Sequence, residues 1–239
     1  RWKTNCTEFG CDEGEYQNGK RVGQWKELCN QFGCASGEYR NSVKVGQWKD
    51  YCGKSGCLGG EYNQYGTKIG HWNEYCLDRG CQGSETSEGN YQEGFKSGQW
   101  KELCTDFGCA EGNYKDGMRS GQWKSFCNEF GCGGGEYKDD TRVGKWKMLC
   151  TEAGCEEGEF SQNGTQVGRW KEWCTSGGCS EGEYDKKGLH IGKWTEHCNE
   201  FGCGSGEYKN GQKVGPWTES CSLNGCVGGE YNPDGKKIG

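Results

Sequence analysis

Residues 25–48 decide the fold; they read W-K-E-L-C-N-Q-F-G-C-A-S-G-E-Y-R-N-S-V-K-V-G-Q-W, from one tryptophan to the next. The pattern W-K-x-x-C-x-x-x-G-C-x-x-G-E-Y recurs along the chain, with steps of 23, 23, 24, 28, 23, 23, 24, 24 and 23 residues between tryptophans. Such a period is typical of a repeat protein. We therefore interpret residues 1–239 as one array of ten units, which begin at Trp2, Trp25, Trp48, Trp72, Trp100, Trp123, Trp146, Trp170, Trp194 and Trp217.

Each unit has the pattern of a β-hairpin. Strand alternation places Trp25 and Glu27 on one face. A four-residue loop ending in glycine separates the two cysteines, and a second tight turn follows, with Asn18-Gly19 as a strong hairpin signal. The segments between glycines are too short for stable helices. We predict an all-β fold, an elongated array of ten stacked antiparallel hairpins that forms either a single-layer sheet or a β-solenoid.

The composition restricts the class of protein. Only 31% of the residues are hydrophobic, whereas 46 are glycine and 20 are cysteine. An even and large cysteine count predicts a disulfide framework in a secreted or cell-surface protein. A cytosolic metal-thiolate protein is the alternative. The net charge of −6 is spread evenly, which favours neither nucleic-acid binding nor membrane insertion. We expect no cofactor and no metal.

The cysteine spacing predicts which pairs are bonded. The two cysteines of every unit are five residues apart, even in the unit that contains an insertion at residues 82–88. Opposed strand residues lie within disulfide range. A rival pairing joins the second cysteine of one unit to the first of the next, but that spacing varies from 18 to 23 residues. We therefore predict Cys6–Cys11, Cys29–Cys34, Cys52–Cys57, Cys76–Cys81, Cys104–Cys109, Cys127–Cys132, Cys150–Cys155, Cys174–Cys179, Cys198–Cys203 and Cys221–Cys226.

Residues 206–217, G-E-Y-K-N-G-Q-K-V-G-P-W, resemble the MORN repeat and the related YwqK-type repeats. The resemblance extends over the whole chain and implies a single-layer antiparallel sheet of stacked hairpins. A tyrosine position of the YwqK-type pattern is occupied here by the first cysteine of the unit. For this reason we do not transfer the intracellular scaffold and antitoxin roles linked to those families.

Several residues are candidate sites. The tryptophan stripe either packs over the glycines or stacks sugar rings. The third residue after each tryptophan, such as Leu28 or Trp173, forms a second stripe that is apolar in the middle units and polar at both ends. This stripe is compatible with capped terminal units or with lateral association. The sequons at Asn163 and Asn5 predict N-glycosylation, with Asn163 in an exposed turn.

We find no catalytic pattern and predict that the protein is not an enzyme. His71, His190 and His197 share no position in the repeat, and we interpret the recurring glutamates as a solvated face.

The two ends of the sequence fit together. Lys236-Lys237-Ile238-Gly239 followed by Arg1-Trp2-Lys3 reads as a normal junction between units. This indicates either a window on a longer array or head-to-tail stacking of subunits. We expect a structural extracellular protein that builds a fibre, filament or surface stalk. The alternative is a binding module whose aromatic face holds a glycan or a protein partner.

Overall fold

The computed structural model describes residues 2–7, 10–30, 33–53, 56–75, 86–105, 108–128, 131–152, 154–175 and 177–238. At several strand ends next to the gaps it describes the backbone alone. Every regular element in these ranges is a β-strand, and no helix in them could span a membrane. The all-β class is therefore confirmed.

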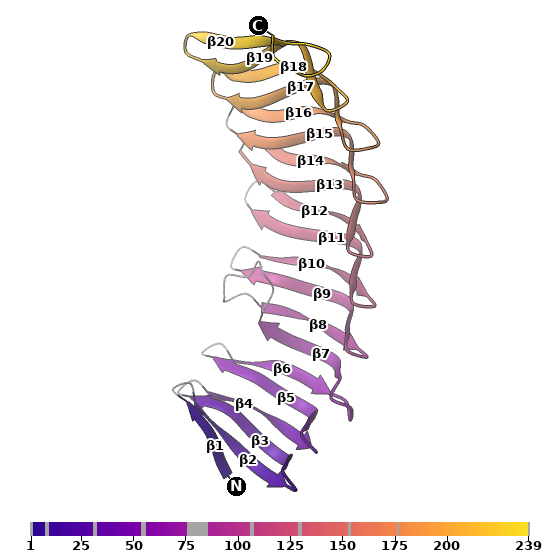
Figure 1. Ribbon diagram of the computed structural model, residues 1–239. Helices are drawn as coiled ribbons and strands as arrows, with labels where there is room; N and C mark the ends of the chain where they lie inside the picture. The colour runs from indigo at the N-terminus through magenta and orange to yellow at the C-terminus, as the bar shows by residue number, and fades with distance from the viewer. Residues whose placement is uncertain are drawn as a thin grey trace. The chain divides into compact units, whose positions relative to one another are not determined.

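Twenty strands follow one another in sequence order, as Figure 1 shows. They are β1 (Trp2–Thr7), β2 (Gly10–Gln17), β3 (Lys20–Asn30), β4 (Gly33–Arg40), β5 (Val43–Gly53), β6 (Gly56–Tyr62), β7 (Lys68–Tyr75), β8 (Thr86–Gln92), β9 (Phe95–Thr105), β10 (Gly108–Lys115), β11 (Met118–Asn128), β12 (Gly131–Lys138), β13 (Thr141–Thr151), β14 (Gly154–Phe160), β15 (Gln166–Thr175), β16 (Gly178–Tyr184), β17 (His190–Asn199), β18 (Gly202–Lys209), β19 (Gln212–Ser222) and β20 (Gly225–Tyr231).

The chain forms two compact units. The N-terminal unit contains Arg1–Asp106 and Asn113–Met118, and the C-terminal unit contains Phe107–Gly112 and Arg119–Gly239. In each of them every strand pairs antiparallel with the next strand along the chain, for example β3 with β4 and β18 with β19. Each unit is thus a ladder of hairpins in an open sheet, which confirms the hairpin array and, of the two predicted forms, favours the single-layer sheet over the β-solenoid.

Two kinds of turn explain why the repeat is 23 residues long in some places and 24 in others. Asn18-Gly19 is a two-residue turn with positive φ at both positions, as in a type I′ hairpin. The other kind is a five-residue loop, such as Asn63–Thr67, in which Asn63 N donates to Thr67 O at 2.9 Å and only Gly66 has positive φ. The longer loop occurs in the repeats that begin at Trp48, Trp146, Trp170 and Trp217, so the extra residue changes the turn and leaves the strands unchanged.

The glycine before Glu-Tyr makes room for the next tryptophan. A Cβ on Gly37 would lie 2.3 Å from the Trp48 ring, and a Cβ on Gly206 would lie 2.2 Å from the Trp217 ring. The indole of Trp48 donates to the Glu38 carbonyl oxygen at 3.1 Å. Described tryptophans of this position are 0–4% exposed. The rings lie flat on the neighbouring hairpin, so the sheet is covered by its own side chains rather than by a second layer.

Candidate functional site

A cation lies over the tryptophan ring in most repeats. It comes from the residue four positions before the tryptophan, and we name this position the cation slot. Lys44 Nζ is 3.9 Å from the Trp48 ring centroid, and Lys213 Nζ is 4.1 Å from that of Trp217. Such cation–π contacts contribute about 0.5–2 kcal/mol, more where water is excluded. In other repeats the cation slot is occupied by Arg21, Lys68, Lys96, Arg119 and Arg142.

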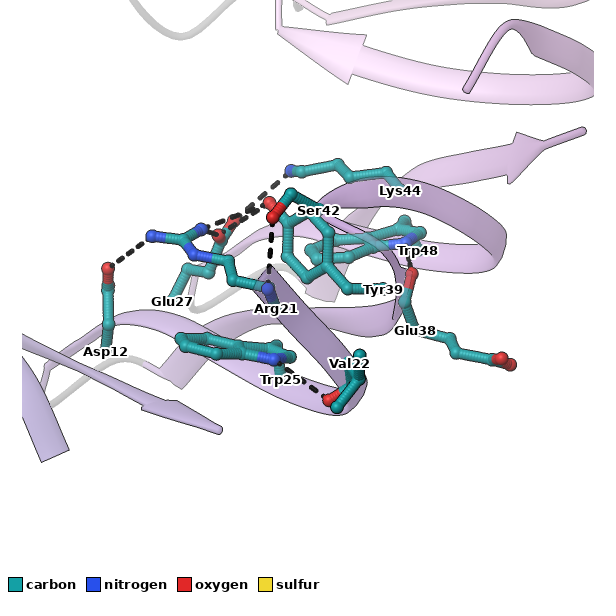
Figure 2. A network of polar contacts seen from close by, with 10 residues as sticks. All are labelled: Asp12, Arg21, Val22, Trp25, Glu27, Glu38, Tyr39, Ser42, Lys44 and Trp48. Carbon is teal, nitrogen blue, oxygen red and sulfur yellow. Dashed lines mark hydrogen bonds and ion pairs between the residues drawn. The ribbon is translucent and has the colours of Figure 1, made fainter. Parts of the chain in front are cut away.

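In several repeats a glutamate two residues after a tryptophan holds the cation in place. Figure 2 shows this network around Glu27, whose carboxylate contacts Arg21 of the preceding repeat and, at 3.2 Å, Lys44 of its own repeat. Lys213 likewise bonds Glu196 of the same repeat at 2.9 Å. The Glu27 side chain is only 14% exposed. Our interpretation of the recurring glutamates as a solvated face is therefore wrong for this position, because the cations and aromatic rings cover them.

The tyrosine of the same repeat completes the network through its hydroxyl group. Tyr39 donates to Glu27 at 2.8 Å and Tyr208 donates to Glu196 at 2.7 Å. Burial, reinforced by the adjacent glutamate, raises the pKa of Tyr39 to about 12. The same two causes raise the pKa of Tyr208. These phenols therefore remain protonated donors at neutral pH. The same bond joins Tyr91 to Glu74, Tyr114 to Glu102, Tyr184 to Glu172 and Tyr231 to Glu219.

Two slots contain other residues. Gln166 donates to Glu172 at 3.3 Å in place of a cation. The imidazole of His190 lies 4.1 Å from the Trp194 ring and within 5 Å of the rings of Tyr184 and Tyr208. Burial lowers the pKa of His190, although Glu172 and Glu196 act in the opposite direction. The slot therefore accepts a neutral polar group that can stack or donate.

Disulfides lie at the opposite ends of the same hairpins. Cys150–Cys155, Cys174–Cys179, Cys198–Cys203 and Cys221–Cys226 are bonded, and each is a pair that the spacing predicts. Cys11 and Cys132 are also disulfide-bonded, and Cys132 stands opposite Cys127 in the backbone register. The bonds contact the neighbouring repeat, since Cys198 Sγ is 3.2 Å from the Cys179 carbonyl oxygen. Disulfides are typical of proteins in an oxidising environment.

In each of the other predicted pairs, at least one cysteine side chain lies outside the described residues. These pairs are Cys6–Cys11, Cys29–Cys34, Cys52–Cys57, Cys76–Cys81, Cys104–Cys109 and Cys127–Cys132. Cys52 and Cys57 are opposite each other in the register of β5 and β6. Cys11 is opposite Cys29 of the next repeat, so register alone does not decide the partner of Cys11.

The remaining predicted site residues that the structure describes do not lie together in one site. Asn163 lies exposed in the Ser161–Thr165 turn, where its side-chain oxygen accepts a hydrogen bond from the Ser161 hydroxyl. Asn5 lies in β1 with its side chain outside the described residues. His71 is exposed, far along the chain from His190. Of the second stripe, the described member Trp173 is 75% exposed.

Open grooves of about 880 and 1120 Å³ lie in the C-terminal unit. Lys145, Lys171 and Glu157 line the first, and Lys193, Glu207 and Val214 line the second. Their walls therefore combine charges of both signs. Within the described residues, no three His, Cys, Asp or Glu side chains are grouped as metal ligands.

No known family matches. None of the protein-family models fits this sequence, and no curated protein is significantly similar to it. The function is therefore argued from the geometry alone.

The sequence contains a signal that links the glutamate and the tyrosine of this network. Every described glutamate of the network has a tyrosine partner, whereas the repeat with Met148 at the glutamate position has Phe160 at the tyrosine position. This paired change is a signal that links the two positions, although Thr4 and Ser125 replace the glutamate in repeats that keep Tyr16 and Tyr137. The residue types at either position alone do not reveal this link. It becomes visible when the two positions are compared repeat by repeat.

Proposed function

We propose that this is a structural extracellular protein that assembles head to tail by continuing its β-array. The edge strand β20 supports this proposal. After β20 the chain turns and begins to pair with it: Ile238 N donates to Glu230 O at 2.8 Å, and Lys237 forms a bridge with Tyr231. Lys237 also bonds Glu219 at 2.6 Å, as Lys213 bonds Glu196 in the interior. The free edge of β20 therefore has the backbone geometry that pairing with a further hairpin requires.

An exposed apolar side chain lies on this edge. Val227 follows the second cysteine of its repeat and is 64% exposed. At the same position in interior repeats, Ala110 is 7% exposed and Ser180 is 6% exposed, because the next hairpin covers them. We propose that a further hairpin of the same pattern covers Val227, and that a second copy of the chain supplies it. An open contact of this kind generates filaments.

The aromatic stripe gives less support to the binding-module alternative. The tryptophan rings of the stripe are almost wholly covered, whereas sugar stacking needs an exposed ring face. Packing is the role that the burial of these rings favours.

Sedimentation velocity and electron microscopy of the non-reduced protein test the assembly. We expect concentration-dependent oligomers that grow along one direction. Val227→Lys adds a charge to the edge and should shift the protein to monomers, whereas Tyr65→Lys, at a turn residue that is 77% exposed, should not. A protein that remains monomeric at all concentrations would contradict the proposal.

A further inference from the structure

The aromatic rings of the N-terminal unit form one uninterrupted column. Tryptophan and tyrosine alternate, and neighbouring ring centroids are 5.0–6.5 Å apart in edge-to-face contact. The members are Tyr16, Trp25, Tyr39, Trp48, Tyr62, Trp72, Tyr91, Trp100 and Tyr114. Packing requires only bulky rings, yet every ring in this column is of a type that can be oxidised by one electron.

The surroundings of the rings differ in a way that affects oxidation. Lys44 and Lys68 lie 3.9 and 4.2 Å from the rings of Trp48 and Trp72, and their charge disfavours a tryptophan radical cation. The tyrosines have an acceptor for their proton, since Tyr39 and Tyr91 donate to Glu27 and Glu74 at 2.8 and 2.9 Å. A tyrosine can therefore lose an electron and transfer its proton to the carboxylate, which leaves a neutral radical.

We propose that this column conducts one-electron oxidation, with tryptophans as transient carriers and tyrosines as resting points. A one-electron oxidant takes an electron from one ring and is itself reduced. The adjacent ring then supplies the missing electron, and Tyr39, Tyr91 or Tyr114, when oxidised, transfers its phenolic proton to the glutamate that it contacts. The glutamate returns this proton when the tyrosine is reduced again by the next ring.

Tyr16 is the exit of this path. It contacts Trp25 at 5.0 Å and is 37% exposed, whereas Trp25, Trp48 and Trp72 are 0–2% exposed. An oxidising equivalent that reaches Tyr16 leaves its radical accessible to solvent, where the proton is lost to water. The column would thus move oxidative damage from the buried rings to the surface, a function independent of head-to-tail assembly.

The C-terminal unit contains a natural contrast. Its rings have a similar spacing, but Phe160 stands between Trp146 and Trp170 at 6.3 and 5.0 Å. Phenylalanine is far harder to oxidise than tyrosine, so this column is interrupted. Phenylalanine is therefore the natural substitution for testing the N-terminal unit.

The test uses His71, which is exposed and adjacent to Trp72. A ruthenium polypyridyl complex attached to His71 is photo-oxidised by a soluble quencher, in protein whose other histidines are replaced (H190K, H197L). A nitroso spin trap then captures accessible radicals, and peptide mass spectrometry locates them. We expect adducts at Tyr16 in this parent protein. Trp48→Phe should reduce them about tenfold or more, whereas Trp100→Phe, beyond Trp72 in the other direction, should not.

Two controls separate conduction from other effects. A soluble ruthenium oxidant should label Tyr16 equally in all variants, which shows that the trap reaches it. If Trp48→Phe does not fold by far-ultraviolet circular dichroism, the Tyr39→Phe and Tyr62→Phe double variant removes only hydroxyls and should give the same loss. No Tyr16 adduct in the parent, or equal adducts in parent and interrupted variants, would overturn the proposal.

Discussion

The repeat that begins at Trp100 and the repeat that begins at Trp146 surround their buried tryptophan rings with different side chains. In the first, Lys96 lies over Trp100 and bonds Glu102, which also accepts the Tyr114 hydroxyl at 2.9 Å. In the second, Met148 replaces the glutamate and Phe160 replaces the tyrosine. Arg142 then lies exposed, with Met148 Sδ 3.4 Å from its guanidinium.

This difference shows that the buried tryptophan ring and its cation are kept where the carboxylate and the tyrosine hydroxyl are both absent. Both repeats keep the tryptophan buried and a cation over its ring. A buried carboxylate without donors is costly, and a buried hydroxyl also needs a partner. That partner is Glu102 for Tyr114 and Arg119 for Tyr137, whose repeat has Ser125 in place of the glutamate.

The largest effect should come from removing the carboxylate. Glu102 is 7% exposed and serves both Lys96 and Tyr114. We expect Glu102→Ala to lower the free energy of unfolding by about 2–3 kcal/mol, because a partly buried cation and a buried hydroxyl lose a shared partner. Urea unfolding of the disulfide-intact protein measures this. Met148→Ala is the matched control, with an expected cost of about 1–2 kcal/mol; equal costs would contradict the account.

A double-mutant cycle sharpens the comparison in the other direction. Met148→Glu with Phe160→Tyr rebuilds the network of the Trp100 repeat within the Trp146 repeat. We expect the double variant to be more stable than the sum of the single variants by about 1 kcal/mol. Arg119 lies 3.4 Å from the Tyr137 hydroxyl in the preceding repeat, so an arginine can partly satisfy a tyrosine alone. A coupling energy near zero would show that the two positions are independent.

Removing only the hydroxyl should have a smaller effect. Tyr114→Phe deletes one hydrogen bond to Glu102 and keeps the ring, so we expect a loss of about 1 kcal/mol in unfolding free energy. The exposed Tyr65 is the control, and Tyr65→Phe should leave the stability unchanged. Comparable losses in both variants would mean that the network adds nothing.

The smallest effect concerns pH. Burial keeps the folded-state pKa of His190 below its ordinary value of about 6.5. The unfolded chain then binds more protons than the folded chain as the pH falls through this value. The contribution of neutral His190 to the stability of the folded protein should be fully present above a pH of about 6.5. It should decline as the pH falls from there towards the folded-state pKa. His190→Lys, which introduces the residue of the other slots, should flatten this part of the Tm profile; an unchanged profile would contradict the assignment.

The sequence predicts much of the fold, because the repeat makes each local signal appear several times. Asn18-Gly19 and its equivalents predict hairpin turns, and the invariant glycine before Glu-Tyr predicts a close approach, since the Trp48 ring fills the space above Gly37. The cysteine interval predicts the four described disulfides. These features depend on neighbours in sequence or directly across a hairpin.

The polar network could not be predicted in the same way. Glu27 joins Arg21 and Lys44 of different repeats, and their meeting depends on the register between β3 and its neighbours. That register shifts at the bulge between Glu13 and Glu15, opposite Gly23 with its φ of 69°. The alternation of side chains along a strand also does not indicate which face of the sheet is covered when the sheet has no second layer. The sequence pattern therefore predicts solvent-exposed glutamates, whereas the cations and rings cover Glu27 in the structure.

The most direct test of the account is disulfide mapping of the native protein by mass spectrometry without reduction. The account rests on hairpins that are each closed by their own disulfide and that are linked to their neighbours by the backbone and by non-covalent contacts, without disulfides between repeats. It predicts an intact mass lower by the 20 hydrogens of the 20 cysteines, no bound metal, and every cross-linked peptide confined to one repeat. Free thiols, bound metal, or a cross-link between repeats such as Cys11 to Cys29 would contradict it.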